Sequence, residues 1–207
     1  MQFHTSGITY PQLHAIKKVG GVVNLRNFYL AGGTALSIYY GHRRSVDLDW
    51  FTPAPLVDPM QFAQLLRDEG VSFVTDSTER GTLYGTLDNI RLSFLEYRYA
   101  LLQPLCFWEE GPCYLASLDD LACMKLAAVA QRGSRKDFID VFVLVQKHKS
   151  LAELLALYQK KYQTENIVSI LMGLVYFDDA EDEPDPQLWS VEWGEVKRQI
   201  AGWVRKI

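Results

Sequence analysis

The first half of the chain combines strand and helix periodicities. Residues 71–97 alternate apolar and polar side chains, and Gly81 and Asp88-Asn89 supply turn signals, so we expect three antiparallel strands there. The pattern as a whole predicts strands at residues 27–31, 46–51, 71–76, 82–87 and 90–97. It predicts helices at residues 10–19, 34–40 and 59–69, the first stopped by Gly20-Gly21 and the second closed by Gly41. Residues 101–115 contain two prolines and a glycine and are expected to be irregular.

From Ser117 to the end of the chain the apolar positions recur with helical spacing. Ser117 and Asp120 resemble a capping box, and the apolar residues that follow predict one buried helix face ending near Gly133. Ser134 is expected to begin a second helix, with Asp137 as a candidate capping acid. Further helices are predicted at residues 151–162, 164–174 and 191–207, with an acidic, proline-containing loop at residues 178–186.

These elements predict an α/β protein in which a small mixed β-sheet is followed by a helical C-terminal half. We expect the boundary between two domains at residue 115, giving an α/β core over residues 1–115 and a helical region over residues 116–207. The active site is expected in the cleft between the two halves.

One stretch of the predicted sheet carries candidate chemistry. Gly32-Gly33-Thr34 leads from a strand into a helix, and the glycines lack a Cβ, so a triphosphate could approach the amides that open the helix. Asp47 and Asp49 are two residues apart on a predicted strand and therefore project from one face. Paired carboxylates suit a hard cation such as Mg²⁺. The alternatives are an ordinary tight turn and a solvated strand end.

The order of these residues resembles a known signature. Gly-Gly-Thr, a helix of about ten residues and then Asp-Leu-Asp resemble the DNA polymerase β-like nucleotidyltransferase superfamily. Arg43-Arg44-Ser45 directly before the acids is similar to the AbiEii/AbiGii toxin branch of that superfamily. The resemblance spans roughly residues 30–203 and includes a second block, which runs from Met124-Lys125 through Arg132 to Asp137 and Asp140.

The resemblance implies a role for each matching residue. Asp47 and Asp49 would bind Mg²⁺ (or Mn²⁺) and act in catalysis, Lys125 would neutralise the phosphates, and Asp137 would activate the acceptor. The implied nucleotide-binding residues are Gly32, Gly33, Thr34, Arg43, Arg44, Ser45, Lys125 and Arg132. Ordinary alternatives remain open: Ser45 may bond the local backbone, the arginine pair and the Lys125/Arg132 edge may be solvated, and Asp137 may only cap its helix.

One expected carboxylate is missing. The superfamily places a third acid on a neighbouring strand, and residues 91–96 are where it should fall, but this sequence offers Ser93. Glu96 lies an odd number of residues away from Ser93, so it should project from the opposite face unless a bulge intervenes. Two acids alone favour one metal ion over two, which puts catalytic activity in question.

Composition limits the function classes. The 207 residues are 48% hydrophobic, enough for a sizeable core, and the formal net charge of −4 argues against a broad basic surface for nucleic acid. The three cysteines lack Cys-x-x-Cys spacing, so neither a disulfide framework nor a zinc site is indicated. No apolar run approaches the roughly 18 residues of a membrane span, and no leader is recognisable at the N-terminus. We therefore expect a cytoplasmic protein.

The sequence and the resemblance together predict a Mg²⁺-dependent nucleotidyltransferase. It would move a nucleoside monophosphate from a nucleoside triphosphate to an acceptor hydroxyl, with RNA such as tRNA as the implied acceptor. The implied setting is a bacterial toxin–antitoxin or abortive-infection system, with a cognate antitoxin as a possible partner. The alternative is a catalytically inactive protein of the same fold that binds a nucleotide or a partner, and Ser93 is the feature that favours it.

Overall fold

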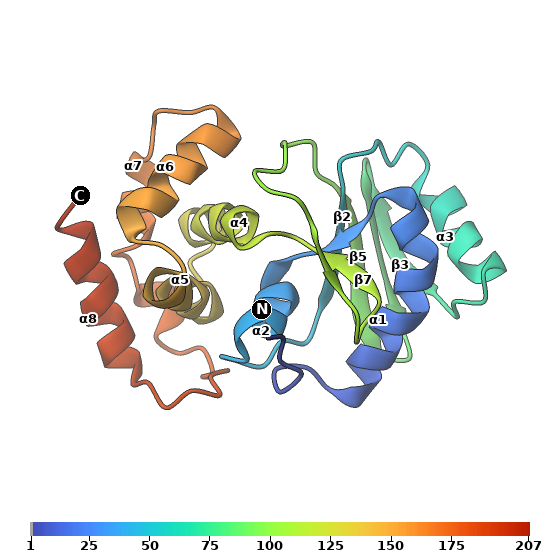
Figure 1. The fold of residues 1–207 in the computed structure, drawn as a ribbon, viewed down its shortest axis with the longest axis horizontal. Helices are drawn as coiled ribbons and strands as arrows, with labels where there is room; N and C mark the ends of the chain where they lie inside the picture. Colours follow the sequence, from blue (N-terminus) through green and yellow to red (C-terminus); the bar gives the residue numbers. More distant parts are fainter. Residues whose placement is uncertain (1) are drawn as a thin grey trace. The chain divides into compact units, whose positions relative to one another are not determined.

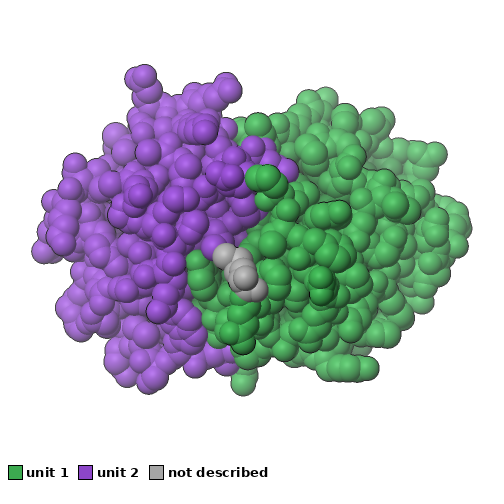
Figure 2. Space-filling view, in the orientation of Figure 1, with its two compact units in different colours: residues 1–100, 104–116 green, residues 101–103, 117–207 purple. Residues whose placement is uncertain are grey.

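The computed structural model describes residues 2–207, which form two compact units (Figure 2). Unit 1 contains the described residues up to Ala100 together with Pro104–Ala116, and unit 2 contains Leu101–Gln103 and Ser117–Ile207. The helices of unit 1 are α1 (Tyr10–Val23), α2 (Gly32–Tyr40) and α3 (Pro59–Asp68), and a 3₁₀ turn covers Asn24–Arg26. Its strands are β1 (Tyr29–Leu30), β2 (Leu48–Thr52), β3 (Val74–Glu79), β4 (Thr82–Leu87), β5 (Ile90–Glu96), β6 (Cys106–Trp108) and β7 (Cys113–Leu115).

The seven strands form one mixed sheet in the order β3-β4-β5-β2-β1-β7-β6. β2 pairs in parallel with β5, and β1 pairs in parallel with β7, whereas the other neighbouring pairs are antiparallel. The predicted α/β fold class with a mixed sheet is therefore confirmed. The three antiparallel strands predicted from the alternating segment are β3, β4 and β5, and β4 has the predicted bounds.

One face of the sheet packs into the core of unit 1. Along β2 buried residues alternate with half-buried ones, so Leu48 and Trp50 enter the core while Asp49 projects from the other face. Phe28, Phe62 and Phe94 form a cluster of rings on the core face, with centroids 5.0–5.7 Å apart. α1 contacts β5 and β7, α3 contacts β3 and β4, and both helices lie on one side of the sheet in Figure 1.

The prediction that Gly20-Gly21 stops the first helix is wrong, because α1 continues to Val23. A Cβ on Gly20 would lie 2.9 Å from the carbonyl oxygen of Pro112, so this glycine permits close approach of the helix to the segment before β7. Tertiary packing thus outweighs the helix propensity of glycine, which is about 1 kcal/mol poorer than that of alanine.

The expectation that residues 101–115 are irregular is also wrong, because they contain the hairpin β6–β7. β7 joins the sheet through a parallel pairing with β1, in which Leu115 lies opposite Leu30. Trp108 and Leu115 are buried, so the hairpin contributes to the core despite the two prolines nearby. The strand predicted at residues 46–51 begins two residues later, at Leu48, so Asp47 directly precedes β2 and only Asp49 lies within it.

Unit 2 is helical. Its helices are α4 (Leu118–Gln131), α5 (Arg135–Lys147), α6 (Leu151–Tyr162), α7 (Val168–Gly173) and α8 (Trp193–Val204), and a 3₁₀ turn covers Asp178–Ala180. α4 packs against α5, α6 and α7, and α5 packs against α8. The Ser117 side chain accepts a hydrogen bond from the amide of Asp120, as the capping prediction requires. α6 has the predicted bounds, whereas α7 is shorter than predicted. None of the helices described in residues 2–207 is long and apolar enough to cross a membrane.

Candidate functional site

The turn from β1 into α2 lies against the carboxylate of Asp49. The amide of Ala31 donates a hydrogen bond to the carbonyl oxygen of Asp49 at 2.9 Å, which ties the start of α2 to β2. Gly32 has a φ of +63°, and a Cβ there would lie 2.6 Å from Asp49 Oδ2. Because α2 opens at this point, its free amides and the positive end of its dipole are close to the carboxylate.

Position 33 requires a glycine because the side chain of Arg43 packs against it. A Cβ on Gly33 would lie 2.0 Å from Arg43 Nη2, so the guanidinium occupies the space that a side chain would fill. Arg43 is buried, and its Nη1 donates a hydrogen bond to the carbonyl oxygen of Arg44 at 2.8 Å. Arg44 itself is exposed. Arg43 therefore supports the glycine turn from inside, while Arg44 is accessible to a ligand.

Thr34 and Ser45 connect α2 to the segment that carries the acids. Thr34 Oγ1 is fully buried and lies 2.8 Å from Ser45 Oγ and 2.5 Å from the carbonyl oxygen of Asp47. Gln12 Nε2 donates to the carbonyl oxygen of Ser45 at 2.8 Å. These contacts fix the backbone that leads into β2, so Thr34 and Ser45 position Asp47.

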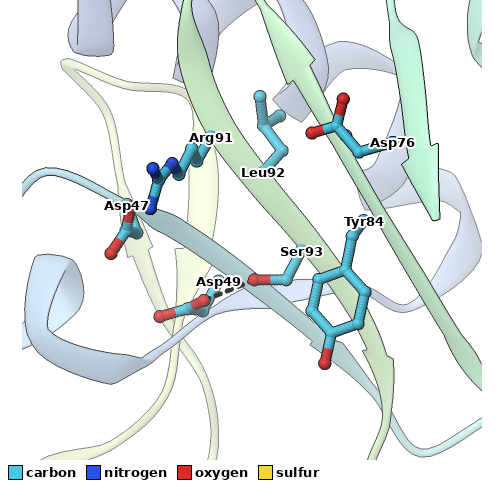
Figure 3. A pocket seen from close by; sticks show the side chains of 8 residues that line it. Asp47, Asp49, Asp76, Tyr84, Arg91, Leu92 and Ser93 are labelled. Carbon is cyan, nitrogen blue, oxygen red and sulfur yellow. Dashed lines mark hydrogen bonds between the residues drawn. The ribbon is translucent and has the colours of Figure 1, made fainter.

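Asp49 lies between the glycine turn and β5. Parallel pairing places Ser93 opposite Asp49, and Ser93 Oγ donates a hydrogen bond to Asp49 Oδ1 at 2.5 Å (Figure 3). Position 93 is therefore next to Asp49, and it carries a hydroxyl group where the resemblance implied a third carboxylate. Glu96 accepts hydrogen bonds from the amide of Leu56 and from Arg98. It is not among the residues that line the cavity around Asp49.

A cavity of about 220 Å³ opens beside the two acids on the face of the sheet away from the core. Figure 3 shows its side chains, with Arg91 directed toward Asp47 and Tyr84 next to Ser93. The lining residues are Asp47, Asp49, Asp76, Tyr84, Gly85, Arg91, Leu92 and Ser93. Sequence reasoning missed Asp76, Tyr84 and Arg91. The alternation of β4 and β5 would have placed Tyr84 and Arg91 on the face of Ser93 once the strand register was known.

The donor atoms at Asp47 and Asp49 fit a hard cation. Carboxylate oxygens are the ligands that Mg²⁺ prefers, and Mg²⁺ is commonly held by one or two carboxylates while phosphates and water complete its coordination. Asp49 Oδ1 accepts the Ser93 hydroxyl, and Oδ2 faces Gly32. Within residues 2–207 no group of three His, Cys, Asp or Glu side chains could hold a metal ion, so phosphates and water would have to complete the coordination at this pair.

The other predicted residues lie in unit 2, in a cluster at the junction of α4 and α5 (the α4–α5 cluster: Lys125, Arg132, Ser134, Asp137 and Asp140). Lys125 Nζ lies 3.2 Å from Asp137 Oδ1 and 2.7 Å from Asp140 Oδ2. Arg132 donates to both oxygens of Asp137, at 2.7 and 2.9 Å, and Ser134 Oγ donates to Asp137 at 2.7 Å. Lys125 of α4 and Arg132, which directly follows that helix, thus bind the same carboxylate, whereas their spacing predicted only that they share a helix face.

The cluster is a buried ion network. Both carboxylates are fully buried and Lys125 is 4% exposed, whereas the Arg132 side chain is 57% exposed. Burial acts to raise the pKa of Asp137, but the charge of Lys125, the hydrogen bonds and charge of Arg132 and the Ser134 hydroxyl outweigh it and lower the pKa. The Ser134 side chain does not cap the backbone of α5, since its hydroxyl goes to Asp137. The proposed capping arrangement is therefore replaced by an ion network that joins two helices.

Comparison with known protein families shows the family to which the chain belongs. The sequence profile of the nucleotidyl transferase AbiEii toxin family, type IV toxin–antitoxin systems, matches residues 24–202. The chain belongs to the AbiEii family. An uncharacterized protein of Aquifex aeolicus is 43% identical over 175 residues, which are 83% of this chain and 84% of that protein. The resemblance derived from Gly32-Gly33-Thr34, Asp47 and Asp49 is thereby confirmed.

Solved structures share the AbiEii fold at low sequence identity. The nucleotidyltransferase toxin MenT4 from Mycobacterium tuberculosis has a TM-score of 0.64 and 15% identity, with 95% of this chain and 82% of that chain covered. A nucleotidyltransferase candidate from H. pylori has a TM-score of 0.57 and 14% identity, with 96% and 95% covered. The antibiotic-resistance factor ANT(2″)-Ia has a TM-score of 0.56 and 12% identity, with 75% and 94% covered. These similarities show that the protein has the nucleotidyltransferase fold.

Proposed function

We propose that this AbiEii-family protein binds a nucleoside triphosphate with Mg²⁺ at Asp47 and Asp49 and transfers the nucleoside monophosphate to a hydroxyl group of RNA. The observation that carries the proposal is the position of the Asp49 carboxylate. It lies between the glycine turn that opens α2 and the hydroxyl of Ser93, at the edge of an open cavity.

The glycine turn supplies the triphosphate side of the proposed site. Gly32 lets the Asp49 carboxylate lie directly against the backbone that opens α2, and the amides at the start of that helix favour negative charge. Arg44 is exposed close to this turn and could bind a phosphate. Thr34 and Ser45, which the resemblance implied as nucleotide ligands, support the site by holding the segment before Asp47.

The chemistry is an in-line displacement at the α-phosphorus. The acceptor oxygen forms a new bond to the α-phosphorus, the bond from the α-phosphorus to the bridging oxygen breaks, and pyrophosphate leaves with the bond electrons. The acceptor proton passes to a carboxylate or to water. When bound, Mg²⁺ would neutralise charge on the phosphate oxygens. Asp47 and Asp49 would hold the ion, and Ser93 would keep the Asp49 carboxylate in its orientation.

The roles predicted for Lys125, Arg132 and Asp137 at the reacting phosphates stay predictions. In unit 2 these residues bind each other in the α4–α5 cluster, which gives them a structural role as well. A cognate antitoxin is the partner that toxin–antitoxin family membership leads us to propose.

The test is transfer of labelled nucleotide to total cellular RNA. Purified protein is incubated with each α-labelled nucleoside triphosphate in Mg²⁺, in Mn²⁺ and in EDTA, and pyrophosphate release is measured in parallel. We expect one or more triphosphates to label RNA in the presence of metal only. Asp47→Asn combined with Asp49→Asn should abolish the transfer, whereas Asp68→Asn, on the exposed end of α3, should not change it. Equal transfer by the double variant would contradict the assignment.

Ser93 supports a second candidate function. A hydroxyl at the third-acid position removes one metal ligand or base, and this favours a protein that binds the nucleotide without turning it over. In that case the parent protein would release no pyrophosphate with any triphosphate tested, but it would still bind a nucleotide, and the double Asn variant would lose that binding.

A further inference from the structure

Side chains form a row across the face of the unit 1 sheet opposite the phenylalanine cluster, on the side of Asp49 away from the glycine turn. Strand register places Ser93 of β5 beside Asp49 of β2 and Tyr84 of β4 beside Ser93. Paired residues of neighbouring strands project from the same face, so these three side chains lie in one line across three strands. The row begins at the proposed metal-binding carboxylate and ends at an aromatic ring that is 38% exposed.

β3 extends this row through a bulge. The register of β3 against β4 shifts between Thr75 and Ser77, and Asp76 lies at the shift. β-Bulges commonly redirect a side chain next to a functional site. Asp76 lines the same cavity as Tyr84 (Figure 3). The bulge therefore brings a third acid to the cavity from a strand that is not adjacent to β2.

Arg91 adds a cation to this part of the cavity. It is exposed on β5, two residues before Ser93, so both side chains project from the same face. Neither the Arg91 nor the Asp76 side chain forms a hydrogen bond or ion pair with another residue in the range 2–207. An unpaired cation, an unpaired anion and an exposed ring around one cavity form a set suited to a ligand with charged, aromatic and hydrogen-bonding parts.

The glycine side of Asp49 leaves little room for a second substrate. Asp49 Oδ2 is so close to Gly32 that a single methyl group there would lie 2.6 Å away. If the triphosphate occupies that side, as the proposed function requires, the acceptor hydroxyl has to reach Asp49 from the Ser93 side. The row from Ser93 to Tyr84 lines the cavity on that side of Asp49 and gives the acceptor a surface next to the carboxylate.

We propose that Tyr84, Arg91 and Asp76 form the acceptor subsite and that they bind the 3′ end of single-stranded RNA. The last base stacks on Tyr84, the phosphate on its 5′ side pairs with Arg91, and Asp76 accepts a hydrogen bond from an amino group of the base. The terminal ribose hydroxyl then lies next to Ser93 and Asp49. This inference rests on the proposed nucleotide transfer and assigns its second substrate to named residues.

The physical chemistry favours a nucleic-acid end over a long nucleic-acid surface. Base–aromatic stacking tolerates any base because every base has a π-face, and one arginine suits one phosphate. With a net charge of −4 the protein lacks a broad basic surface, so its contact with RNA has to be local. A cavity of about 220 Å³ holds one nucleotide end rather than a helix.

The experiment measures RNA binding by fluorescence anisotropy, with a 5′-labelled, mixed-sequence, single-stranded oligoribonucleotide in Mg²⁺. Tyr84→Ala should weaken binding about 5- to 150-fold, the range that corresponds to loss of one base–aromatic stack. Tyr84→Phe keeps the ring and should bind within about twofold of the parent. Tyr114→Ala is the matched control, because Tyr114 is 39% exposed on β7 of the same sheet but lines no part of this cavity.

Arg91 is tested through the salt dependence of binding. Arg91→Gln should reduce the slope of log affinity against log salt by about one phosphate contact. Arg80→Gln, an exposed arginine in the turn after β3, is the control and should leave the slope unchanged. Blocking the 3′ hydroxyl of the oligonucleotide with a phosphate should weaken binding to the parent, because the proposed ribose position is next to Asp49.

Three results would overturn the subsite. Tyr84→Ala could bind as tightly as the parent, Tyr114→Ala could lose as much affinity as Tyr84→Ala, or the parent could fail to bind RNA. Competition by a polyamine that disappears in Asp76→Asn would instead assign the cavity to a cationic acceptor and would equally reject RNA. Pyrophosphate release is measured separately. RNA binding that depends on Tyr84 without any transfer would contradict the proposed function, whereas transfer with an unchanged KM for RNA in Tyr84→Ala would contradict only the subsite.

Discussion

Gly32 meets two requirements that only glycine satisfies at once. Its φ of +63° is in the left-handed region, which costs a residue with a Cβ about 1–3 kcal/mol. The Asp49 side chain also lies where a side chain of residue 32 would be, since a Cβ there would be 2.6 Å from Asp49 Oδ2. Backbone conformation and the close approach of Asp49 therefore impose the same choice of residue.

We expect Gly32→Ala to lose about 1–3 kcal/mol of stability and to lose nucleotide binding as well. The added methyl group would push against the Asp49 carboxylate and displace this proposed metal ligand from the start of α2. Chemical denaturation gives the free energy of unfolding, and titration with a nucleoside triphosphate in Mg²⁺ gives the affinity.

Gly21→Ala is the control for this substitution. Gly21 lies in α1 with nothing within 4 Å of a Cβ built on it, so alanine should stabilise the protein by up to about 1 kcal/mol. Nucleotide affinity should stay at the parent value. If Gly32→Ala retained full affinity after its stability loss was taken into account, the glycine turn would have only a conformational role.

Single residues were predictable where the chemistry lies in one stretch of sequence. The spacing of Asp47 and Asp49 and the turn at Gly32 are local, so the sequence alone brought them together. Tyr84 and Asp76 were missed because their place depends on strand register and on a bulge. The register between two strands depends on packing across the sheet, so it cannot be predicted from the sequence of either strand alone.

At the scale of elements, the α4–α5 cluster is the contact that joins two helices through charge. Breaking a buried ion pair by removing one partner costs about 3–5 kcal/mol, because it leaves an uncompensated charge. In this cluster Asp137 compensates two cations, Lys125 and Arg132. The bidentate contact from Arg132 fixes the chain where α4 ends and α5 begins.

We expect Asp137→Asn to lower the free energy of unfolding by about 3 kcal/mol, the lower end of that range. Asn can still accept hydrogen bonds, Asp140 still pairs with Lys125, and the Arg132 side chain is exposed enough to be solvated. Glu165→Gln, at an exposed position between α6 and α7, serves as the control and should stay close to the parent. If Asp137 also acts as a catalytic base, the folded variant should lose about 10²-fold or more in turnover.

The pH dependence of stability distinguishes charge from packing at Asp137. Its folded-state pKa is lowered from the ordinary value of 3.8, so its contribution to stability is complete above pH 3.8 and is lost as the pH falls below it. We therefore expect the stability difference between the parent and Asp137→Asn to shrink as the pH falls through this range. A difference that does not change with pH would mean that packing, not charge, accounts for the loss.

Elements built from local periodicity were predicted more reliably than elements that depend on distant partners. β4 and α6 have the predicted bounds because alternation and capping signals lie within each segment. The hairpin β6–β7 was missed because β7 is stabilised by pairing with β1, far away in the sequence. α1 continues past its two glycines because one of them packs closely against the chain before β7.

At the scale of the whole molecule, the mixed α/β class follows from the change of period near Ser117, and the structure confirms that class. Ligand binding links the proposed site to the stability of the fold. A ligand that binds only the folded state stabilises it by RT ln(1 + [L]/Kd), or about 2.7 kcal/mol when the ligand is at 100 times its Kd. This gain requires binding but no turnover.

We expect a nucleoside triphosphate with Mg²⁺ at that saturation to raise the melting temperature by about 5–10 °C, since 1 kcal/mol corresponds to about 2–4 °C in a chain of this size. The triphosphate in EDTA should give a much smaller rise, because without a cation Asp47 and Asp49 repel its phosphates. The variant with Asp47→Asn and Asp49→Asn should show no rise that depends on metal.

Hydrogen exchange locates the stabilisation. Because the proposed ligands all lie in unit 1, added protection should centre on α2, β2 and β5, and it should be absent in the double variant. The melting temperature could rise with metal while hydrogen exchange slows only in α4 and α5. That result would place the nucleotide elsewhere and would reject Asp47 and Asp49 as its metal ligands. The melting temperature could instead rise with added protection at α2 and β2 but without pyrophosphate release. That result would support the nucleotide-binding candidate, in which Ser93 in place of a third carboxylate prevents transfer.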